Sequence, residues 1–109
     1  MSRRNSSVNA APVFAALGDE TRLALVARLG HDGPLSIARL TEETRVTRQA
    51  VTKHLEVLAR AGLVHAQRTG RERLWVVNPQ KLHDARRYLE QMSKQWDEAL
   101  ERLAAFVER

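Results

Sequence analysis

Seven basic side chains fall within residues 45–75, where only two acidic residues, Glu56 and Glu72, accompany them. The chain has 109 residues, and its segments 1–44 and 76–109 each carry equal numbers of basic and acidic residues. The middle stretch therefore holds the entire formal net charge of +5. Localised positive charge attracts polyanions, nucleic acid first among them. The alternative is a solvated basic face that only aids solubility, and charge alone does not choose between the two.

Two residues of this stretch, Arg48 and Gln49, have side chains that can read base pairs. Arginine pairs with O6 and N7 of guanine, and glutamine pairs with N6 and N7 of adenine. Thr47 can cap a helix whose first N–H groups face a phosphate. The remaining predicted DNA contacts, to phosphates or bases, are Thr52 and Lys53 one turn later, Arg45 in the preceding turn, and Arg68, Arg71 and Arg73. For each position the alternative is a solvated surface residue.

The elements that must position these residues follow from apolar spacing and capping signals. Four helices are predicted, and the fourth carries the basic residues on its outer face. The first helix has Ala10, Val13, Phe14 and Leu17 on one side. The second is capped by Asp19, carries Leu23, Val26 and Leu29 on one side, and stops at Gly30. The third is capped by Ser36, and the fourth is capped by Thr47 and ends at Gly62. A short turn between the third and fourth predicts a helix-turn-helix. His54 falls on the apolar stripe of the fourth helix, which predicts a partly buried packing histidine.

From Leu63 onward the residues favour strands on either side of a glycine-containing turn, which predicts a β-hairpin over residues 63–78. Gly70 suits a turn position with positive φ. Arg68, Arg71 and Arg73 cluster at the hairpin tip, and at most two are expected to face DNA because Glu72 can pair with one. Trp75 is expected to pack within the strand. A helix-turn-helix followed by a cationic hairpin is a winged helix, so the fold class is mainly α with a small β-hairpin (α+β).

The terminal segment, residues 79–109, predicts one long helix. Its apolar residues recur at spacings of three and four, as in helices that associate along a seam. From Leu82 the helix would be about 40 Å long, too long for the small body to cover. We therefore expect a homodimer, with the alternative of a helix folded back on its own domain. The predicted interface residues are Val13, Phe14, Leu89, Met92, Trp96, Ala99, Leu100, Leu103 and Phe106.

Two segments resemble motifs of the ArsR-type winged-helix repressors. That family's opening motif, LGdpTRl, is similar to Leu17-Gly18-Asp19-Glu20-Thr21-Arg22-Leu23, and its recognition-helix motif, lSqstvSrHLkvLreAGLV, is similar to residues 46–64, VTRQAVTKHLEVLARAGLV. The hairpin through Gly70 and Arg71 resembles the family's wing. The resemblance covers roughly residues 10–78. It implies a DNA-binding repressor that acts by occupying a promoter.

The chain departs from the metal-sensing members of that family. Their Cys-x-Cys site on the helix before the turn is matched here by Ser36 and Ala38, which are not soft-metal ligands. A second known site needs paired histidines on the terminal helix, where this chain has only His83. The chain contains no cysteine, which also excludes disulfides and iron–sulfur clusters. We therefore expect no metal site and no cofactor.

Further patterns argue against other function classes. No nucleophile–base pairing, Gly-rich phosphate loop or metal-ligand spacing is visible, so we expect no enzyme. The apolar run over residues 10–17 follows Arg3 and Arg4 but is too short for a signal peptide, and no stretch suits a membrane span. The expected layout is a flexible tail over 1–8, a winged helix-turn-helix over 9–78 and a dimerisation helix over 79–109.

These observations predict a cytoplasmic dimer that binds double-stranded DNA at an imperfect palindrome and is nucleoid-associated when bound, without a membrane partner. Two alternatives stay open. The terminal helix could dock a different protein, with the basic face incidental. RNA binding is the weaker alternative because exposed aromatic side chains that stack on bases are missing. An effector, the operator and the regulated genes are not indicated by the sequence.

Overall fold

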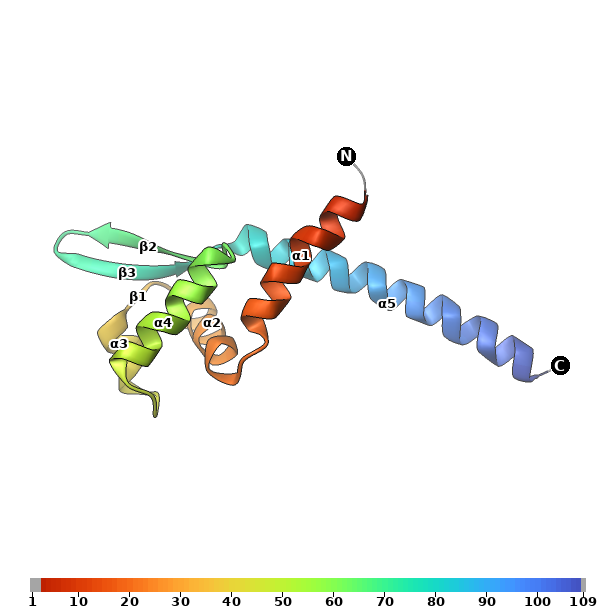
Figure 1. The fold of residues 1–109 in the computed structure, drawn as a ribbon, viewed down its shortest axis with the longest axis horizontal. Coiled ribbons are helices and arrows are strands. Elements are labelled where there is room, and N and C mark those ends of the chain that lie inside the picture. The colour runs from red at the N-terminus through yellow and green to blue at the C-terminus, as the bar shows by residue number, and fades with distance from the viewer. Residues whose placement is uncertain (1–2, 109) are drawn as a thin grey trace.

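The computed structural model describes residues 3–108, and their side chains from Ala10 to Glu108. Four helices and a small antiparallel sheet form a body from which the fifth and last helix extends outward (Figure 1). In chain order the elements are α1 (Arg3–Leu17), α2 (Glu20–Asp32), β1 (Leu35–Ser36), α3 (Ile37–Glu42), α4 (Arg48–Arg60), β2 (Val64–Thr69), β3 (Glu72–Val77) and α5 (Pro79–Val107). The predicted winged helix-turn-helix with a long terminal helix is confirmed.

Side-chain caps fix where α2, α3 and α4 begin. Asp19, Ser36 and Thr47 were each expected to cap a helix, and each accepts a hydrogen bond from the backbone N–H three residues later, at 3.0–3.2 Å. Such bonds satisfy one of the N–H groups that the first helical turn leaves without a partner. Asn78 caps α5 in the same way by accepting a bond from the N–H of Gln80. The three predicted caps are confirmed.

Two helix boundaries differ from the expected ones. Helix α1 begins at Arg3, so residues 3–8, expected as part of a flexible tail, are helical; residues 1–2 lie outside the described residues. Helix α2 continues through Gly30 and ends at Asp32, and its C-cap is Gly33, whose φ of +82° is accessible to glycine at low cost. The N–H of Gly33 donates to the carbonyl of Leu29, so Gly33 rather than Gly30 terminates the helix.

The sheet contains one strand that the sequence did not suggest. The strand order is β1-β3-β2, and the two residues of β1 pair with Trp75 and Leu74 of β3. In the predicted hairpin, Thr69 pairs with Glu72 across the two-residue loop Gly70-Arg71. Gly70 has a φ of +65°, as a tight hairpin turn of this length requires. The predicted hairpin is therefore confirmed.

The hydrophobic core lies where α1, α2, α4 and the sheet meet. It includes six leucines that are at most 2% exposed: Leu25, Leu29, Leu40, Leu55, Leu58 and Leu63. Trp75 is 6% exposed, as expected for a residue that packs within its strand. Leu23, by contrast, was expected to face inward and is 54% exposed, because α2 turns Leu25, Val26 and Leu29 toward the core instead.

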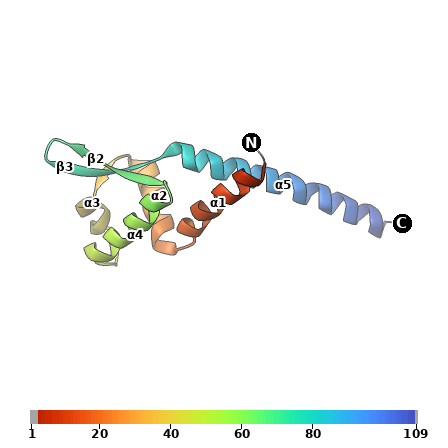
Figure 2. The ribbon, with the colours of Figure 1, turned by 45° about the horizontal axis from the view of Figure 1, so that its top comes forward.

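Helix α5 packs on the body only through its first turns. It crosses α1, where the rings of Phe14 and Tyr88 lie 5.7 Å apart, and then extends away from the other elements (Figure 2). Ala85 is the one buried residue of the helix among those described. Beyond Tyr88 the apolar seam is uncovered within the protomer.

Candidate nucleic-acid interface

The first turns of α4 and the wing border a common depression on the surface. Its volume is about 450 Å³. Helix α4 contributes Arg48 and Thr52, and β3 contributes Glu72, Arg73 and Trp75, with the start of α3 between them. The helix-turn-helix and the hairpin therefore present their polar side chains on one side of the body. This arrangement lets a single duplex contact both elements.

The side chains of α4 that are predicted to contact DNA differ in their exposure and in their hydrogen bonds within the protein. Thr47, Arg48, Gln49 and Lys53 are exposed, whereas Thr52 is half-buried. The Thr52 hydroxyl donates to the carbonyl oxygen of Arg48 at 2.9 Å, which occupies its proton inside the helix. Thr52 can therefore act toward DNA only as a hydrogen-bond acceptor or through its methyl group, a narrower role than predicted.

The lysine and arginine side chains of residues 45–75 have no acidic partners among the described side chains. Within residues 10–108, none of these seven lysine and arginine side chains lies within 4.0 Å of a carboxylate. Elsewhere, Arg28, Arg39, Arg86 and Arg87 each form an ion pair. Glu72, which could have paired with one arginine of the wing, forms no ion pair with any of the three. The wing and recognition helix therefore keep their charge for an external anion.

Two of the basic side chains are placed in ways that the sequence did not show. The Arg73 guanidinium lies over the Trp75 ring, 5.1 Å from its centroid, which fixes it by a cation–π contact. Residues two apart on a strand share one face, so alternation along β3 could have indicated this pair. Arg60 lies at the far end of α4, beside Pro12 and Val57, and does not border the depression.

A polar cluster holds α4 against the junction of α1 and α2. The His54 ring nitrogen Nδ1 lies 3.4 Å from Nη1 of Arg22 and 3.8 Å from Oδ2 of Asp19. Arg22 Nε also donates to the carbonyl of Ala16 at 2.6 Å. The hydrogen bond from the Arg22 backbone N–H lowers the pKa of Asp19, so its carboxylate stays charged at neutral pH. His54 is half-buried, as expected, and this cluster helps to fix the recognition helix on the body.

The predicted interface residues of α5 lie mostly on an open surface. Leu89, Trp96, Leu100, Leu103 and Phe106 are 51–72% exposed. Met92, Ala99 and the Phe14 ring of α1 are half-buried. Val13, also predicted for the interface, is 2% exposed because it packs inside its own protomer, which leaves little of its side chain for a second copy.

An apolar groove lies at the base of this surface. It has a volume of about 500 Å³ and runs between α1 and the first turns of α5, where Phe14, Leu17, Leu82 and Leu89 line it. The two halves of α5 carry opposite net charge: residues 79–94 have four basic and two acidic side chains, and residues 95–107 have one basic and three acidic. A second α5 running antiparallel would therefore meet complementary charge.

No ion-binding cluster accompanies these surfaces. In the described part of the chain, no three His, Asp or Glu side chains come close enough to hold a metal ion. The same residues include no helix with the length and hydropathy of a bilayer span.

Known proteins share both this sequence pattern and this geometry. A family described as a helix-turn-helix domain matches residues 17–67. An HTH-type transcriptional regulator from Mycobacterium tuberculosis is 38% identical over 95 residues, which cover 87% of this chain and 85% of that protein. An uncharacterised HTH-type transcriptional regulator from Bacillus subtilis is also 38% identical, over 64% of this chain and 83% of that protein.

Solved structures extend the similarity beyond the matched domain. An ArsR-like transcriptional regulator from Rhodococcus sp. RHA1 superposes with a TM-score of 0.78 at 35% identity, over 91% of this chain and 92% of that one. A homodimeric winged helix-turn-helix DNA-binding domain from Mycobacterium bovis superposes with a TM-score of 0.63 at 24% identity, over 94% and 93%. The second comparison supports the fold alone.

Proposed function

This chain belongs to the ArsR-type winged-helix transcriptional regulators, and from that premise we propose that it is a homodimeric repressor that occupies its promoter by binding an imperfect palindrome. The observation that carries the proposal is the unpaired cationic face formed by α4 and the wing. Among the side chains of residues 10–108, none of the seven cations of residues 45–75 has a carboxylate partner, and two of them, Arg48 and Arg73, border the depression between α4 and the wing. A protein that acts this way would work in the cytoplasm, associated with the nucleoid when bound.

Each protomer would place the start of α4 in the major groove. Arg48 and Gln49 are exposed in its first turn and would read base edges, since both side chains can form two hydrogen bonds to one base. Arg45, Lys53, Arg68 and Arg71 would contact phosphates, and these contacts position the protein without reading sequence. The Trp75 ring would hold Arg73 at the edge of the wing, beside the DNA backbone.

A second copy of the chain is the occupant that we propose for the seam of α5. An antiparallel α5 would carry its Leu103 and Phe106 toward the groove lined by Phe14, Leu82 and Leu89 of its partner. The acidic second half of each helix would then lie along the basic first half of the other. The Mycobacterium bovis neighbour, which has the same fold, is itself described as homodimeric. Such a dimer would present its two recognition helices to half-sites about 34–36 Å apart, which is one turn of DNA.

The exposed seam also supports a second candidate function, a module whose α5 docks a different protein while the basic face is incidental. In that case the purified protein would sediment as a monomer and would bind duplex DNA no better than other small basic proteins do. Sedimentation together with binding to random duplex at low and high salt separates the two functions.

The division between base-reading and phosphate-anchoring residues can be tested with Gln49→Ala and Arg71→Ala. We expect Gln49→Ala to cost about 1–3 kcal/mol per half-site and to relax the preference at one base pair. Arg71→Ala is expected to weaken binding to all sequences alike, because a phosphate contact carries no base information. Fluorescence anisotropy against a panel of single-base operator variants measures both effects.

A suitable control for both variants is Arg60→Ala. Arg60 is an exposed cation of the same helix without an ion pair in the described structure, but it lies at the far end from the depression. It should change DNA affinity little. If Gln49→Ala and Arg71→Ala altered the operator panel identically, the assignment of reading and anchoring roles would be wrong.

A further inference from the structure

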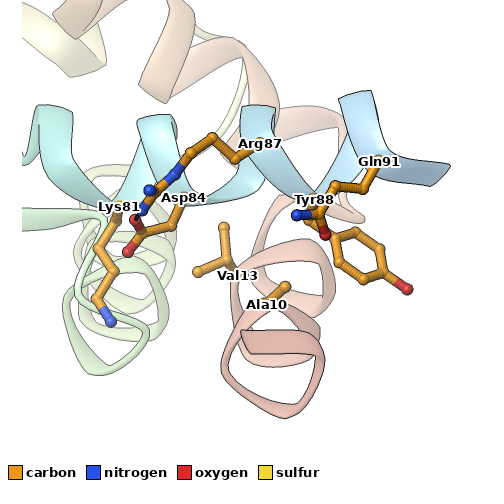
Figure 3. Close-up of a pocket in the computed structure, with 7 residues that line it drawn as sticks. All are labelled: Ala10, Val13, Lys81, Asp84, Arg87, Tyr88 and Gln91. Carbon is orange, nitrogen blue, oxygen red and sulfur yellow. Dashed lines mark hydrogen bonds and ion pairs between the residues drawn. The ribbon is translucent and has the colours of Figure 1, made fainter. Parts of the chain in front are cut away.

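A cleft separates α1 from the first half of α5 on the side away from the apolar groove. Its volume is about 250 Å³. Among the described residues it is lined by Ala10 and Val13 of α1 and by Lys81, Asp84, Arg87, Tyr88 and Gln91 of α5 (Figure 3). Ligand sites for drug-sized molecules usually measure about 300–1,000 Å³, so this cleft suits a smaller molecule.

The cleft has an apolar floor and polar ends. Ala10 and Val13 point into its centre and are 4% and 2% exposed (Figure 3). Lys81 lies at one end, and Tyr88 and Gln91 lie at the other. A ligand that fits would therefore combine a compact apolar body with a polar group at the Lys81 end.

Of the two cationic side chains that line the cleft, one is paired with a carboxylate and the other is not, among the described side chains. Arg87 Nη2 lies 2.8 Å from Oδ1 of Asp84, and that oxygen also accepts from the Gln80 side chain at 3.4 Å. The Arg87 and Asp84 charges therefore compensate each other. Lys81 has no carboxylate within 4.0 Å among residues 10–108. One uncompensated positive charge beside an apolar floor matches a singly charged anion.

The Lys81 side chain is anchored on the end of the recognition helix. Its carbon chain crosses Gly62, where an added Cβ would lie 2.9 Å from Lys81 Cε. Gly62 follows the C-cap of α4, Ala61, and has a φ of +80°. Its carbonyl oxygen accepts a hydrogen bond from the Asn78 side chain at 3.0 Å. The lysine stem therefore touches the corner that joins α4 to β2, and the Lys81 side chain borders the cleft at that end.

From these contacts we propose that the cleft binds a small organic monocarboxylate, with its carboxylate on Lys81 and its apolar body on Ala10 and Val13. Each of four cleft residues directly precedes an apolar residue of the α5 seam: Lys81, Asp84, Tyr88 and Gln91. Consecutive residues of a helix lie about 100° apart around its axis, so the cleft residues and the seam residues face different directions. The site is therefore separate from the seam proposed for the second copy. Because Lys81 packs on Gly62, the bound anion acts directly at the end of α4.

The test is an NMR titration of the full chain with benzoate, butyrate and hexanoate, each paired with its neutral amide. We expect a carboxylate to shift the Val13 methyl, Tyr88 ring and Gly62 amide signals, with the amide counterpart binding about tenfold more weakly or worse. Lys81→Gln should lower the carboxylate affinity by about tenfold or more, since it removes a charged hydrogen bond. Lys94→Gln is the matched control, because Lys94 is an exposed lysine of the same helix outside the cleft.

The proposal is overturned if none of the three carboxylates shifts these signals. It is also overturned if acids and amides bind alike, or if Lys81→Gln and Lys94→Gln bind equally well. Lys81 lies at the protein surface, and an unchanged amide spectrum of the free variant shows that its fold is kept. The titration contains no DNA, so its outcome is independent of whether the DNA-binding proposal holds.

Discussion

Replacing Leu103 by aspartate is expected to convert the protein into a monomer and to weaken operator binding by about 10³-fold or more. Leu103 is 59% exposed in the protomer, so the substitution disturbs no core packing. In the proposed dimer it would place two carboxylates in an apolar seam, where unpaired charge is strongly disfavoured. A monomer would contact one half-site only, and its affinity should fall toward the non-specific level. Sedimentation equilibrium and anisotropy titration measure the two effects.

The matched control for this variant is Leu23→Asp. Leu23 is a leucine of α2 with a similar exposure of 54%, but it lies outside the seam. It should leave both the mass and the operator affinity unchanged. A Leu103→Asp protein that still sedimented as a dimer would contradict the proposed seam, and a monomer with full operator affinity would contradict the need for two copies.

Raising the salt concentration from about 50 to 200 mM is expected to weaken DNA binding by about 10⁴-fold. Each protomer offers Arg45, Lys53, Arg68 and Arg71 as phosphate contacts, which gives about eight contacts per dimer. Each contact releases condensed counterions, so the logarithm of the binding constant should fall with the logarithm of salt at a slope of about −7. The absence of carboxylate partners for these cations within residues 10–108 strengthens the expectation, since no internal ion pair competes with the phosphates.

The salt dependence also tests a single wing residue. Arg71→Ala should make the slope shallower by about 1 for each protomer, because one phosphate contact is lost in each. Gln49→Ala should leave the slope unchanged, since a base contact displaces few counterions. A wild-type slope shallower than about −3 would mean that the cationic face does not lie along the DNA backbone.

Local signals in the sequence were sufficient for most of the helix-turn-helix and for the wing. Asp19, Ser36 and Thr47 cap helices through bonds to N–H groups three residues away, so the information lies within one turn. Gly70 marks the hairpin because its turn needs a positive φ. The apolar seam of α5 is equally local, since its period is set by the helix itself.

Features that depend on contacts between distant residues were missed or misplaced. Strand β1 has two residues and exists because Leu35 and Ser36 pair with residues of β3 about 40 positions later. His54 meets Asp19 and Arg22 only after α4 packs on the α1–α2 junction. Leu23 was misassigned, and the deep burial of Val13 within the protomer was not expected. Apolar spacing shows that a helix has a buried side, but it does not show which of its apolar residues the rest of the fold covers.

The most direct test of the account is to select binding sites from a random pool of duplex DNA with the purified protein. We expect enriched sequences with approximate twofold symmetry and half-site centres about 10–10.5 base pairs apart. We further expect that, at about 150 mM salt, these fragments bind about 10³-fold more tightly than scrambled versions of the same composition. Equal affinity for selected and scrambled fragments would contradict the claim that paired copies of this chain recognise specific DNA.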